Sequence, residues 1–261
     1  MSRRSPGGRG KGKSKPRGKS PQKEGGRRLI VGRRFILEGL AGGTVDQVHV
    51  EKAALSKLPE LQSAADRAGV TLTIASRDEL DHQAKGIRHQ GVIGSGPPYP
   101  YRSVESLLEL DAPLLVALDE ITDPQNFGAI IRSALVFGAD GVLVPRHRSA
   151  TLSPAVVRAS AGATERARIA EVPNLQRTLQ MIGEHGLEVV GLAADGDVTI
   201  DGLGPAPLGR VVVVGSEGKG LRRMVRERCH RIASIPQAGD FDSLNASVAT
   251  GIALYEASRT R

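Results

Sequence analysis

Six apolar runs recur through the second half of the chain, and they restrict its fold more than any other feature. Each run is rich in Val, Leu and Ile, and helix-length segments separate most of them; the runs are "LLVALDE", "GVLVP", "ARIAEV", "LEVVGLAA", "VVVVGSEG" and "IASIP". Strands of near-continuous apolar sequence are typical of parallel sheets that are buried on both faces. We therefore predict an α/β domain over residues 113–261, with a parallel sheet that helices cover on both sides.

The region before this domain has a second α/β pattern. "RLIVGRRFILEGL" and "LPELQSAADRAG" have helical apolar spacing, whereas "VDQVHVEK", "VTLTIAS" and "HQGVIGS" are typical of strands. These elements predict a small α/β domain over residues 29–95. The proline-rich stretch "GPPYPYRSVESLLELDAP" interrupts the periodicity and predicts a linker over residues 96–112.

The N-terminal segment of the chain is strongly basic. Residues 1–28 contain eleven of the 36 Lys and Arg residues and one of the 28 Asp and Glu residues, so the remainder of the chain is close to neutral. This segment of Gly, Pro, Ser, Lys and Arg has little apolar surface to bury, which predicts a disordered tail. The tail is suited to bind a polyanion such as nucleic acid, and the alternative is a solubilising extension.

The composition excludes several classes of protein. No apolar run reaches the roughly 18 residues of a membrane-spanning helix, and the N-terminus lacks the apolar region of a signal peptide. Cys229 is the only cysteine, which excludes an internal disulfide and a multi-thiolate metal site. We expect a cytoplasmic protein that uses neither a metal nor a membrane.

Ligands of open parallel sheets bind beyond the carboxyl ends of the strands, so the loops after the apolar runs are candidate sites. The first of these loops contains Asp123-Pro124, which ends the strand, and Asn126, which can cap the following helix. Arg132 lies beside the apolar stripe of that helix. Two interpretations stay open for Arg132: a solvated helix arginine, or a planar guanidinium group that clamps a phosphate.

The loop after "VVVVGSEG" contains Gly215, Gly218 and Gly220. A strand that runs into such a loop lets a ligand approach the backbone, but a tight strand-to-helix turn explains the glycines equally well. Their spacing differs from that of dinucleotide-binding and phosphate-binding loops. Glu217 is unsuited to stabilise an anion and is suited to orient an arginine.

The last apolar run leads into "IPQAGDFDSLNASVATGIALYE", which begins like a strand and ends like a helix. Asp242 or Ser243 can cap this helix. Capping leaves Asn245 and Ser247 unexplained, because polar side chains have weak helix propensity but can point at a ligand. The glycine loop and this segment are adjacent strand-end loops, both rich in glycine, which predicts one shared pocket.

Three of these segments together resemble the signature motifs of the SpoU/TrmH family, the RNA ribose 2′-O-methyltransferases of the SPOUT superfamily. The segments are "DPQNFGAIIRSALVFGADGV", "VVVVGSEGKGL" and "IPQAGDFDSLNASVATGIALYE", and they occur in matching order across the parallel-sheet domain. The small domain, including "HQGVI", is similar to the ribosomal-protein-like domain that binds substrate RNA in many members.

The resemblance implies a fold, a cofactor and an assembly. The C-terminal segment is expected to thread through a loop and form a deep trefoil knot, and the domain is expected to form a homodimer. The knot would hold S-adenosyl-L-methionine. Position in the motifs assigns cofactor binding to Gly215, Ser216, Gly218, Ile235, Leu244 and Ser247.

The resemblance also implies methyl transfer to the ribose 2′-hydroxyl of a guanosine in 23S ribosomal RNA. It assigns catalytic roles to Arg132, Asn126, Glu217, Ser243 and Asn245. Because a guanidinium group stays protonated in proteins, we expect Arg132 to clamp a substrate phosphate while Asn126, Glu217 and Asn245 orient it and the hydroxyl.

This function has three alternatives, one within the same family and two from other classes. The first is a transfer RNA ribose methyltransferase, and the second is an RNA-binding protein without catalytic activity. A dinucleotide-binding oxidoreductase is disfavoured, because its glycine loop would come near the start of the α/β domain and here it comes late.

Overall fold

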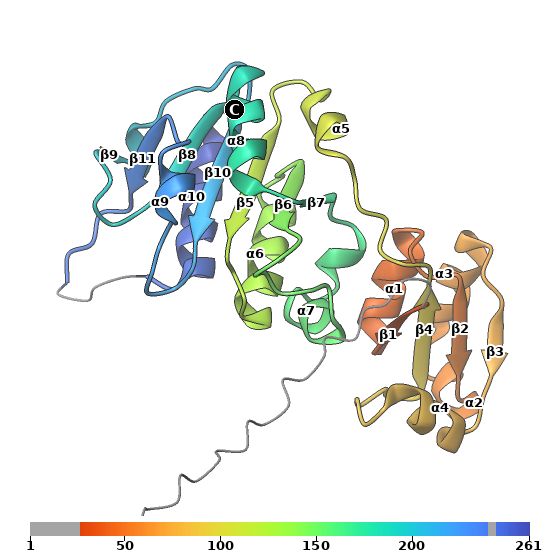
Figure 1. Cartoon of the computed structure of the whole chain (residues 1–261). Coiled ribbons are helices and arrows are strands. Elements are labelled where there is room, and N and C mark those ends of the chain that lie inside the picture. The colour runs from red at the N-terminus through yellow and green to blue at the C-terminus, as the bar shows by residue number, and fades with distance from the viewer. Residues whose placement is uncertain (1–26, 240–243) are drawn as a thin grey trace, which may run out of the picture.

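The computed structural model describes residues 27–239 and 244–261, which form two modules, each with its own β-sheet (Figure 1). Residues 1–26 of the predicted disordered tail lie outside the described residues. Ser243, one of the predicted site residues, lies outside them as well. Within the described ranges, none of the helices has both the length and the apolar character needed to cross a membrane.

The N-terminal module, from β1 to β4, is a four-stranded sheet in the order β1-β4-β2-β3. β4 runs antiparallel to β1 and β2, and β2 runs parallel to β3. Its elements are β1 (Arg28–Val31), α1 (Arg33–Ala41), β2 (Gln47–Val50), α2 (Lys52–Leu55), α3 (Pro59–Ala68), β3 (Leu72–Ile74), α4 (Arg77–Ala84) and β4 (Val92–Gly96). Side chains that include Ile30, Ile36, Val48, Leu61 and Val92 form its apolar core.

The prediction of one helix over "RLIVGRRFILEGL" was wrong for its first residues. Arg28–Val31 form strand β1, and helix α1 begins only at Arg33. A short apolar run fits the period of a strand as well as that of a helix. Pairing decides between them, because Leu29 and Val31 lie opposite Ser95 and Ile93 of β4, far away in the sequence.

The C-terminal module contains a seven-stranded sheet in the order β7-β6-β5-β10-β8-β11-β9, and all neighbouring strands are parallel. The strands are β5 (Leu114–Asp119), β6 (Gly141–Pro145), β7 (Ile169–Val172), β8 (Glu188–Leu192), β9 (Val198–Thr199), β10 (Arg210–Gly215) and β11 (Arg231–Ser234). The predicted parallel sheet is confirmed, and the two-residue β9 is the strand that no apolar run indicated.

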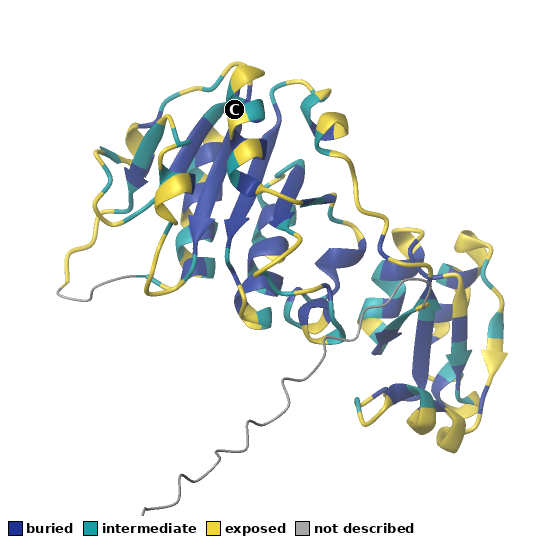
Figure 2. Cartoon of the chain, viewed as in Figure 1, coloured by how far each residue is buried: buried dark blue, intermediate teal, exposed yellow. Residues whose placement is uncertain are grey.

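Helices cover both faces of this sheet, as predicted. α6 (Pro124–Val136), α7 (Pro154–Ala159) and α10 (Ala246–Arg259) pack on one face, and α5 (Val104–Leu108), α8 (Leu175–Glu184) and α9 (Arg223–Arg226) pack on the other. Strand β10 shows why its run of valines is continuous, because Val212 and Val214 face the first layer while Val211 and Val213 face the second. Each fully buried valine contributes about 1.5–3 kcal/mol, and Figure 2 shows the central strands buried along their length.

Residues 96–112, predicted as a linker, include helix α5. Leu107 of α5 is buried in the core beside β6, where it lies against Gly141. The later part of this segment therefore packs on the large sheet, and the part before α5 carries the chain from one module to the other (Figure 1).

Helix α10 packs against α6 and β10 in the middle of the sheet. The strand that precedes it, β11, lies two positions away from β10 in the sheet. The chain therefore returns towards the middle of the sheet before α10 begins. Threading of this return through a loop, the predicted trefoil knot, stays a prediction.

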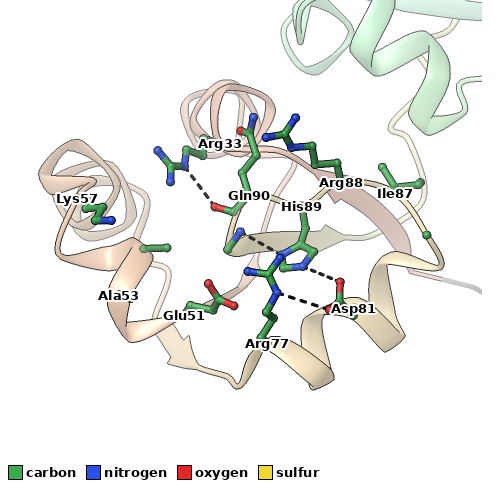
Figure 3. Close-up of a pocket in the computed structure, with 13 residues that line it drawn as sticks. Arg33, Glu51, Ala53, Lys57, Arg77, Asp81, Ile87, Arg88, His89 and Gln90 are labelled. Carbon is green, nitrogen blue, oxygen red and sulfur yellow. Dashed lines mark hydrogen bonds and ion pairs between the residues drawn. The ribbon is translucent and has the colours of Figure 1, made fainter.

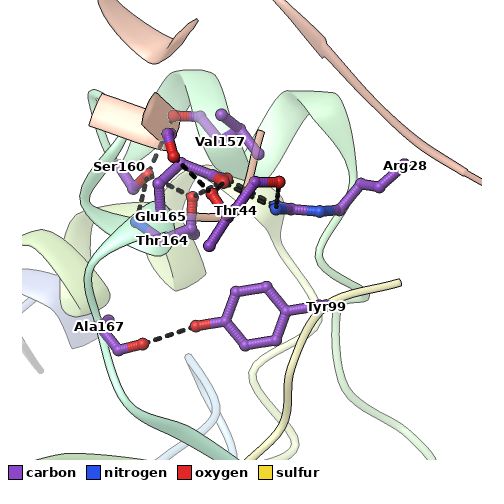
Figure 4. A network of polar contacts seen from close by, with 9 residues as sticks. Arg28, Thr44, Tyr99, Val157, Ser160, Thr164, Glu165 and Ala167 are labelled. Carbon is purple, nitrogen blue, oxygen red and sulfur yellow. Dashed lines mark hydrogen bonds and ion pairs between the residues drawn. The ribbon is translucent and has the colours of Figure 1, made fainter. Parts of the chain in front are cut away.

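A buried carboxylate joins the two modules (Figure 4). Glu165, at the end of the 3-10 helix η1 (Ala163–Glu165), accepts hydrogen bonds from both terminal guanidinium nitrogens of Arg28 over 2.6 and 2.7 Å. It also accepts hydrogen bonds from the hydroxyl groups of Thr44 and Thr164. The Glu165 side chain is 0% exposed, and these donors compensate the cost of burying its charge.

Tyr99, which follows β4, adds to this junction. Its hydroxyl group donates a hydrogen bond to the carbonyl oxygen of Ala167 over 2.6 Å, and the Arg28 guanidinium lies 5.3 Å from the centre of its ring. Burial raises the pKa of Tyr99 above its ordinary value, so the hydroxyl group stays a donor at neutral pH.

We expect Glu165→Ala to lower the free energy of unfolding in urea by about 3–5 kcal/mol, because Arg28 loses its partner while it is buried. Glu171→Ala is the control, since it breaks an exposed pair with Arg146, and such pairs contribute at most about 1 kcal/mol. Equal losses in the two variants would contradict a structural role for the buried pair.

Candidate functional site

A cavity of about 680 Å³ opens at the carboxyl ends of β8, β10 and β11. This volume lies within the range of roughly 300–1,000 Å³ typical of small-molecule sites. The cavity brings together the glycine loop after β10, the ends of β8 and β11, and the residues just before and within the first turn of α10. Of the residues predicted to bind the cofactor, it is lined by Gly215, Ser216, Gly218, Ile235 and Leu244.

The glycine loop is a tight turn that closes on itself. The backbone N–H of Ser216 donates to the carbonyl oxygen of Gly220 over 3.1 Å, and the N–H of Gly220 donates back to Ser216 over 2.8 Å. A Cβ atom at Gly215 would lie 2.1 Å from the carbonyl carbon of Gly220, so only glycine allows this approach. The two interpretations of the glycines hold together, because the tight turn is also a wall of the cavity.

Asn245 connects the three predicted motifs. Its Oδ1 atom accepts hydrogen bonds from the backbone N–H groups of Ser247 and Val248 over 2.9 and 3.3 Å, which makes it the N-cap of α10. Its Nδ2 atom donates to Asn126 Oδ1 over 2.9 Å and to Glu217 Oε1 over 2.5 Å. The backbone donors determine the orientation of the amide, because only its oxygen can accept from them.

The sequence misplaced the caps of both helices at this site. The N-cap of α6 is Asp123, whose carboxylate accepts from the backbone N–H of Asn126 over 3.1 Å, so Asn126 is not the cap. The N-cap of α10 is Asn245 rather than Asp242 or Ser243. Several residues that favour N-cap positions stand within a few residues of each helix start, and local preference does not choose among them.

Asn126, Glu217 and Asn245 therefore form one hydrogen-bonded cluster, defined here as the amide cluster. Asn126 is buried at 7% exposure, whereas Glu217 and Asn245 are exposed. Glu217 also lines the 680 Å³ cavity, so the cluster lies at its rim. Glu217 was predicted to orient an arginine, and in the structure it accepts its hydrogen bond from Asn245 instead.

Two of the predicted site residues lie apart from the cavity. Ser247 donates its hydroxyl hydrogen to Asn245 Oδ1 over 2.6 Å, and it lines a groove between α6 and α10. Arg132 is exposed on α6 and forms no hydrogen bond or ion pair with the part of the chain that the structure describes. Arg132 lies six positions after Asn126 on this helix, which places the two side chains on different faces.

Two charged pairs near the cavity were not predicted. Asp195 and Arg226 line it and form an ion pair of 2.8 Å, and the hydrogen bond from Arg226 lowers the pKa of Asp195 below its ordinary value. Fully buried Asp119 accepts from the backbone N–H of Arg222 over 2.8 Å and from its Nε over 2.6 Å, which anchors the chain after the glycine loop. Asp119 lies at the end of one apolar run and Asp195 directly follows another. This position at a strand end is the signal that could have identified them as site residues.

The described ranges contain no group of three or more His, Cys, Asp or Glu side chains arranged to hold a metal ion. Burial raises the pKa of the Cys229 thiol to about 12, so it is protonated at neutral pH and is a poor nucleophile. A loop-built cavity at the carboxyl edge of a parallel sheet is the position at which open α/β proteins bind their ligands, so the fold and the cavity define a ligand-binding α/β protein.

The chain matches known proteins over both modules. Residues 113–255 match the SpoU rRNA Methylase family, and residues 29–102 match the family described as RNA 2'-O ribose methyltransferase substrate binding. The chain is 47% identical over 240 residues to a protein of Mycobacterium avium (strain 104) named as an uncharacterized tRNA/rRNA methyltransferase, and the alignment covers 89% of this chain and 77% of that protein.

Two solved structures share the fold along most of both chains. The AdoMet-bound rRNA methyltransferase from Sinorhizobium meliloti has a TM-score of 0.75 and 25% identity, and the match covers 89% of this chain and 87% of that one. The SpoU methyltransferase AviRb from Streptomyces viridochromogenes, in complex with AdoMet, has a TM-score of 0.75 and 27% identity over 90% of each chain.

The chain belongs to the SpoU rRNA methylase family. It is an RNA methyltransferase, and its cofactor is S-adenosylmethionine. The family resemblance, the fold class and the cofactor predicted from the sequence motifs are confirmed.

The cavity at the strand ends fits this cofactor. If the cofactor binds here, Leu192, Val214 and Ile235 would supply apolar walls for its adenine ring, and the backbone of the glycine loop would supply polar groups. The charges of Asp195 and Arg226 have opposite signs, as do the ammonium and carboxylate groups of a methionine moiety.

We expect Gly215→Ala to raise the Kd for S-adenosylmethionine at least about tenfold, or 1.4 kcal/mol, because the new Cβ displaces the loop that lines the cavity. Gly202→Ala is the matched control, since Gly202 lies outside the lining of the cavity and the nearest atom to its Cβ would be the side-chain oxygen of Thr199 at 3.3 Å. Calorimetric titration of both variants measures the effect, and equal affinities would show that the glycine loop is not part of the cofactor site.

Proposed function

We propose that this enzyme transfers a methyl group to the ribose 2′-hydroxyl of a guanosine in 23S ribosomal RNA. The observation that supports the proposal most is the amide cluster at the rim of the cofactor cavity. It presents amide groups and a carboxylate beside the cavity, which is the kind of surface that positions a hydroxyl group. The match of residues 29–102 to a family that binds RNA for ribose 2′-O-methylation supports the choice of a ribose hydroxyl.

The residues of the cluster have distinct roles in this proposal. S-adenosylmethionine, when bound, would supply an electrophilic methyl group through its sulfonium C–S bond and leave as S-adenosylhomocysteine. Glu217 accepts a hydrogen bond from the ribose hydroxyl and so increases its nucleophilicity, because amide groups are poor proton acceptors. Asn245 holds Glu217 through Nδ2, and Asn126 holds Asn245 in turn. Ser243, outside the described residues, keeps its predicted catalytic role as part of the proposal.

Arg132 is proposed to clamp a phosphate of the substrate RNA. Its guanidinium group stays protonated and its planar fork can bind two phosphate oxygens. Because Arg132 lies on a different face of α6 from Asn126, it is poorly placed to serve the cavity of its own chain. In a dimer, Arg132 of each copy could instead reach the cavity of the other copy.

The surface beside Arg132 supports the predicted homodimer. A groove between α6 and α10 is lined by Phe137, Val248, Ile252 and Tyr255, together with Ala129, Ser133, Ser247 and Gly251. Val136 beside it is 70% exposed, and Val248 and Tyr255 are about half exposed. Monomeric proteins rarely leave a contiguous apolar face open, and an isologous contact between two copies would bury it.

The predicted organisation of the chain forms part of the same proposal. The tail over residues 1–28 would contact RNA, the domain over residues 29–95 would hold the substrate, and residues 96–112 would link it to a knotted catalytic domain over residues 113–261. A transfer RNA substrate is the alternative within the family. The intact amide cluster argues against a protein that binds RNA without catalysing its methylation.

We expect labelled methyl groups to enter 23S rRNA at one guanosine ribose when the enzyme is incubated with S-adenosylmethionine and total RNA from cells that lack it. Arg132→Ala should reduce this incorporation at least about 100-fold, since a removed transition-state contact costs several kcal/mol, and leave cofactor affinity unchanged. Incorporation into transfer RNA alone would favour the alternative substrate, and incorporation into no RNA would refute the proposed function.

Mixed dimers test whether Arg132 serves the partner's cavity. Arg132→Ala homodimers are expected to be nearly inactive, and so are Gly215→Ala homodimers when the assay holds S-adenosylmethionine well below their raised Kd. Random mixing in a two-fold dimer then makes half of the dimers mixed, each with one complete site, so activity should return to about a quarter of the wild-type value. If the mixture stays inactive after subunit exchange has been verified, Arg132 acts within its own chain.

A further inference from the structure

A second cavity, of about 580 Å³, lies in the N-terminal module and has no part in the proposed reaction (Figure 3). It is bounded by the start of α1, by α2, by the start of α4 and by the turn that precedes β4. Its charged lining side chains are those of Arg33, Lys57, Arg77, Arg88, Glu51 and Asp81. We name it the basic cavity, because cationic side chains outnumber the acidic ones.

Most of these cations have no acidic partner of their own. Arg77 lies 3.9 Å from Asp81, whereas no carboxylate of the described residues forms an ion pair with Arg33, Lys57 or Arg88. Guanidinium groups that are not neutralised by neighbouring acids attract anions, and a concave surface concentrates their field. The basic cavity is therefore suited to an anionic ligand, and arginine favours phosphate.

The floor of the basic cavity is held by a buried histidine. His89 is 4% exposed, its Nδ1 atom accepts from the backbone N–H of Gly91 over 3.0 Å, and its Nε2 atom lies 3.1 Å from Asp81 Oδ1. Because the backbone N–H can only donate, the neutral imidazole carries its hydrogen on Nε2 and donates it to Asp81. Gly91 has φ +81°, and a Cβ there would lie 2.6 Å from that of Ala54, so the turn requires glycine.

Gln90, between these two residues, has a strained backbone. Its φ of 55° is rare for a residue other than glycine, and its carbonyl oxygen accepts a hydrogen bond from Arg33 Nε over 3.3 Å. Its side chain is exposed, and Figure 3 shows its amide on the same side of the turn as the guanidinium groups of Arg33 and Arg88. Strain of this kind persists where the surroundings enforce it, and it is concentrated at ligand-binding sites.

We propose that the basic cavity binds one unstacked nucleotide of the RNA substrate, with its phosphate on Arg33 and Arg88 and a base edge on Gln90. This inference rests on the proposed function for the identity of the ligand as RNA. An amide offers a donor and an acceptor to a base edge, and proteins that read RNA sequence target bases that are splayed out of a helix. The cavity volume lies within the range of nucleotide-sized sites.

The proposed contacts are of two kinds, which differ in whether they make binding depend on salt or on RNA sequence. Arg33 and Arg88 contact phosphate, so their contribution depends on salt and not on sequence. Gln90 contacts a base, so its contribution depends on sequence and not on salt. The basic cavity would thus select which nucleotide of an RNA is presented to the enzyme, in addition to holding the chain.

Binding of unmodified 23S rRNA transcript to the full chain, measured between low and physiological salt, tests the inference. Arg33→Gln and Arg88→Gln should each weaken binding and reduce the slope of log affinity against log salt by about 0.7–0.9. Arg67→Gln is the matched control, because Arg67 is an exposed arginine of the same module outside the cavity, and it should change affinity less than about twofold.

Substitutions at Gln90 have to tolerate its positive φ angle. Gln90→Gly removes the amide and accepts a positive φ, so a loss of about tenfold in affinity with an unchanged salt slope reports the base contact. Gln90→Asn keeps the amide and tolerates this φ, and it should recover part of the affinity. Arginine and Gln90 variants that bind like Arg67→Gln would overturn the inference.

An assay of RNA methylation, compared with the binding data, distinguishes failure of this inference from failure of the proposed function. If the wild-type chain binds the transcript through the basic cavity but methylates no RNA, the inference stands and the proposed function fails. If methylation of 23S rRNA is seen while the cavity variants keep wild-type affinity and KM for RNA, the inference fails and the proposed function stands. The cavity variants should keep wild-type affinity for S-adenosylmethionine in every case.

Discussion

The carboxylate of Glu165 is buried where the two modules meet, and their arrangement depends on the groups that satisfy its charge. Arg28 and Thr44 come from the N-terminal module, and Thr164 comes from the same short helix as Glu165. A buried charge without partners is costly, so these donors keep the end of η1 against the N-terminal sheet. The basic cavity and the 680 Å³ cavity consequently belong to one framework. An RNA that contacts both of them has to match their separation, which makes the junction a determinant of substrate shape as well as of stability.

Asn245 has a similar role within the C-terminal module. One face of its amide caps α10, and the other joins Asn126 of α6 to Glu217 of the glycine loop. From the sequence, a helix cap and a binding site were competing explanations for the polar residues before α10. In the structure Asn245 caps α10 and also joins two other motif residues at the rim of the cavity, because an amide has an acceptor for the backbone and donors for its neighbours. The stability of α10 and the geometry of the cluster therefore change together.

The large sheet was predictable because burial on both faces leaves a direct trace in the sequence. The four valines of β10 alternate between two apolar layers, so none of them is polar. Shorter elements leave no such trace. β1 was read as part of a helix, β9 is only two residues long, and the N-caps of α6 and α10 lie two or three residues from the predicted ones. Each of these features depends on pairing or packing with residues that are distant in the chain, and local propensity is a weak guide there.

The sequence by itself determined the α/β class, the parallel sheet, the position of the glycine loop and the three motifs that identify the family. These depend on local periodicity and on residue types at fixed spacing, which a linear pattern contains. Only the tertiary structure decided which motif residues meet. It placed Asn126 and Glu217 on Asn245 across 119 and 28 residues of chain, whereas Ser247 lines a groove between α6 and α10 and Arg132 is exposed on α6. It also decided that Glu165 is buried between the modules and that the turn at Gln90 borders a basic cavity. Contacts of this kind follow from how helices and strands pack together, and packing is set by the whole chain rather than by any segment of it.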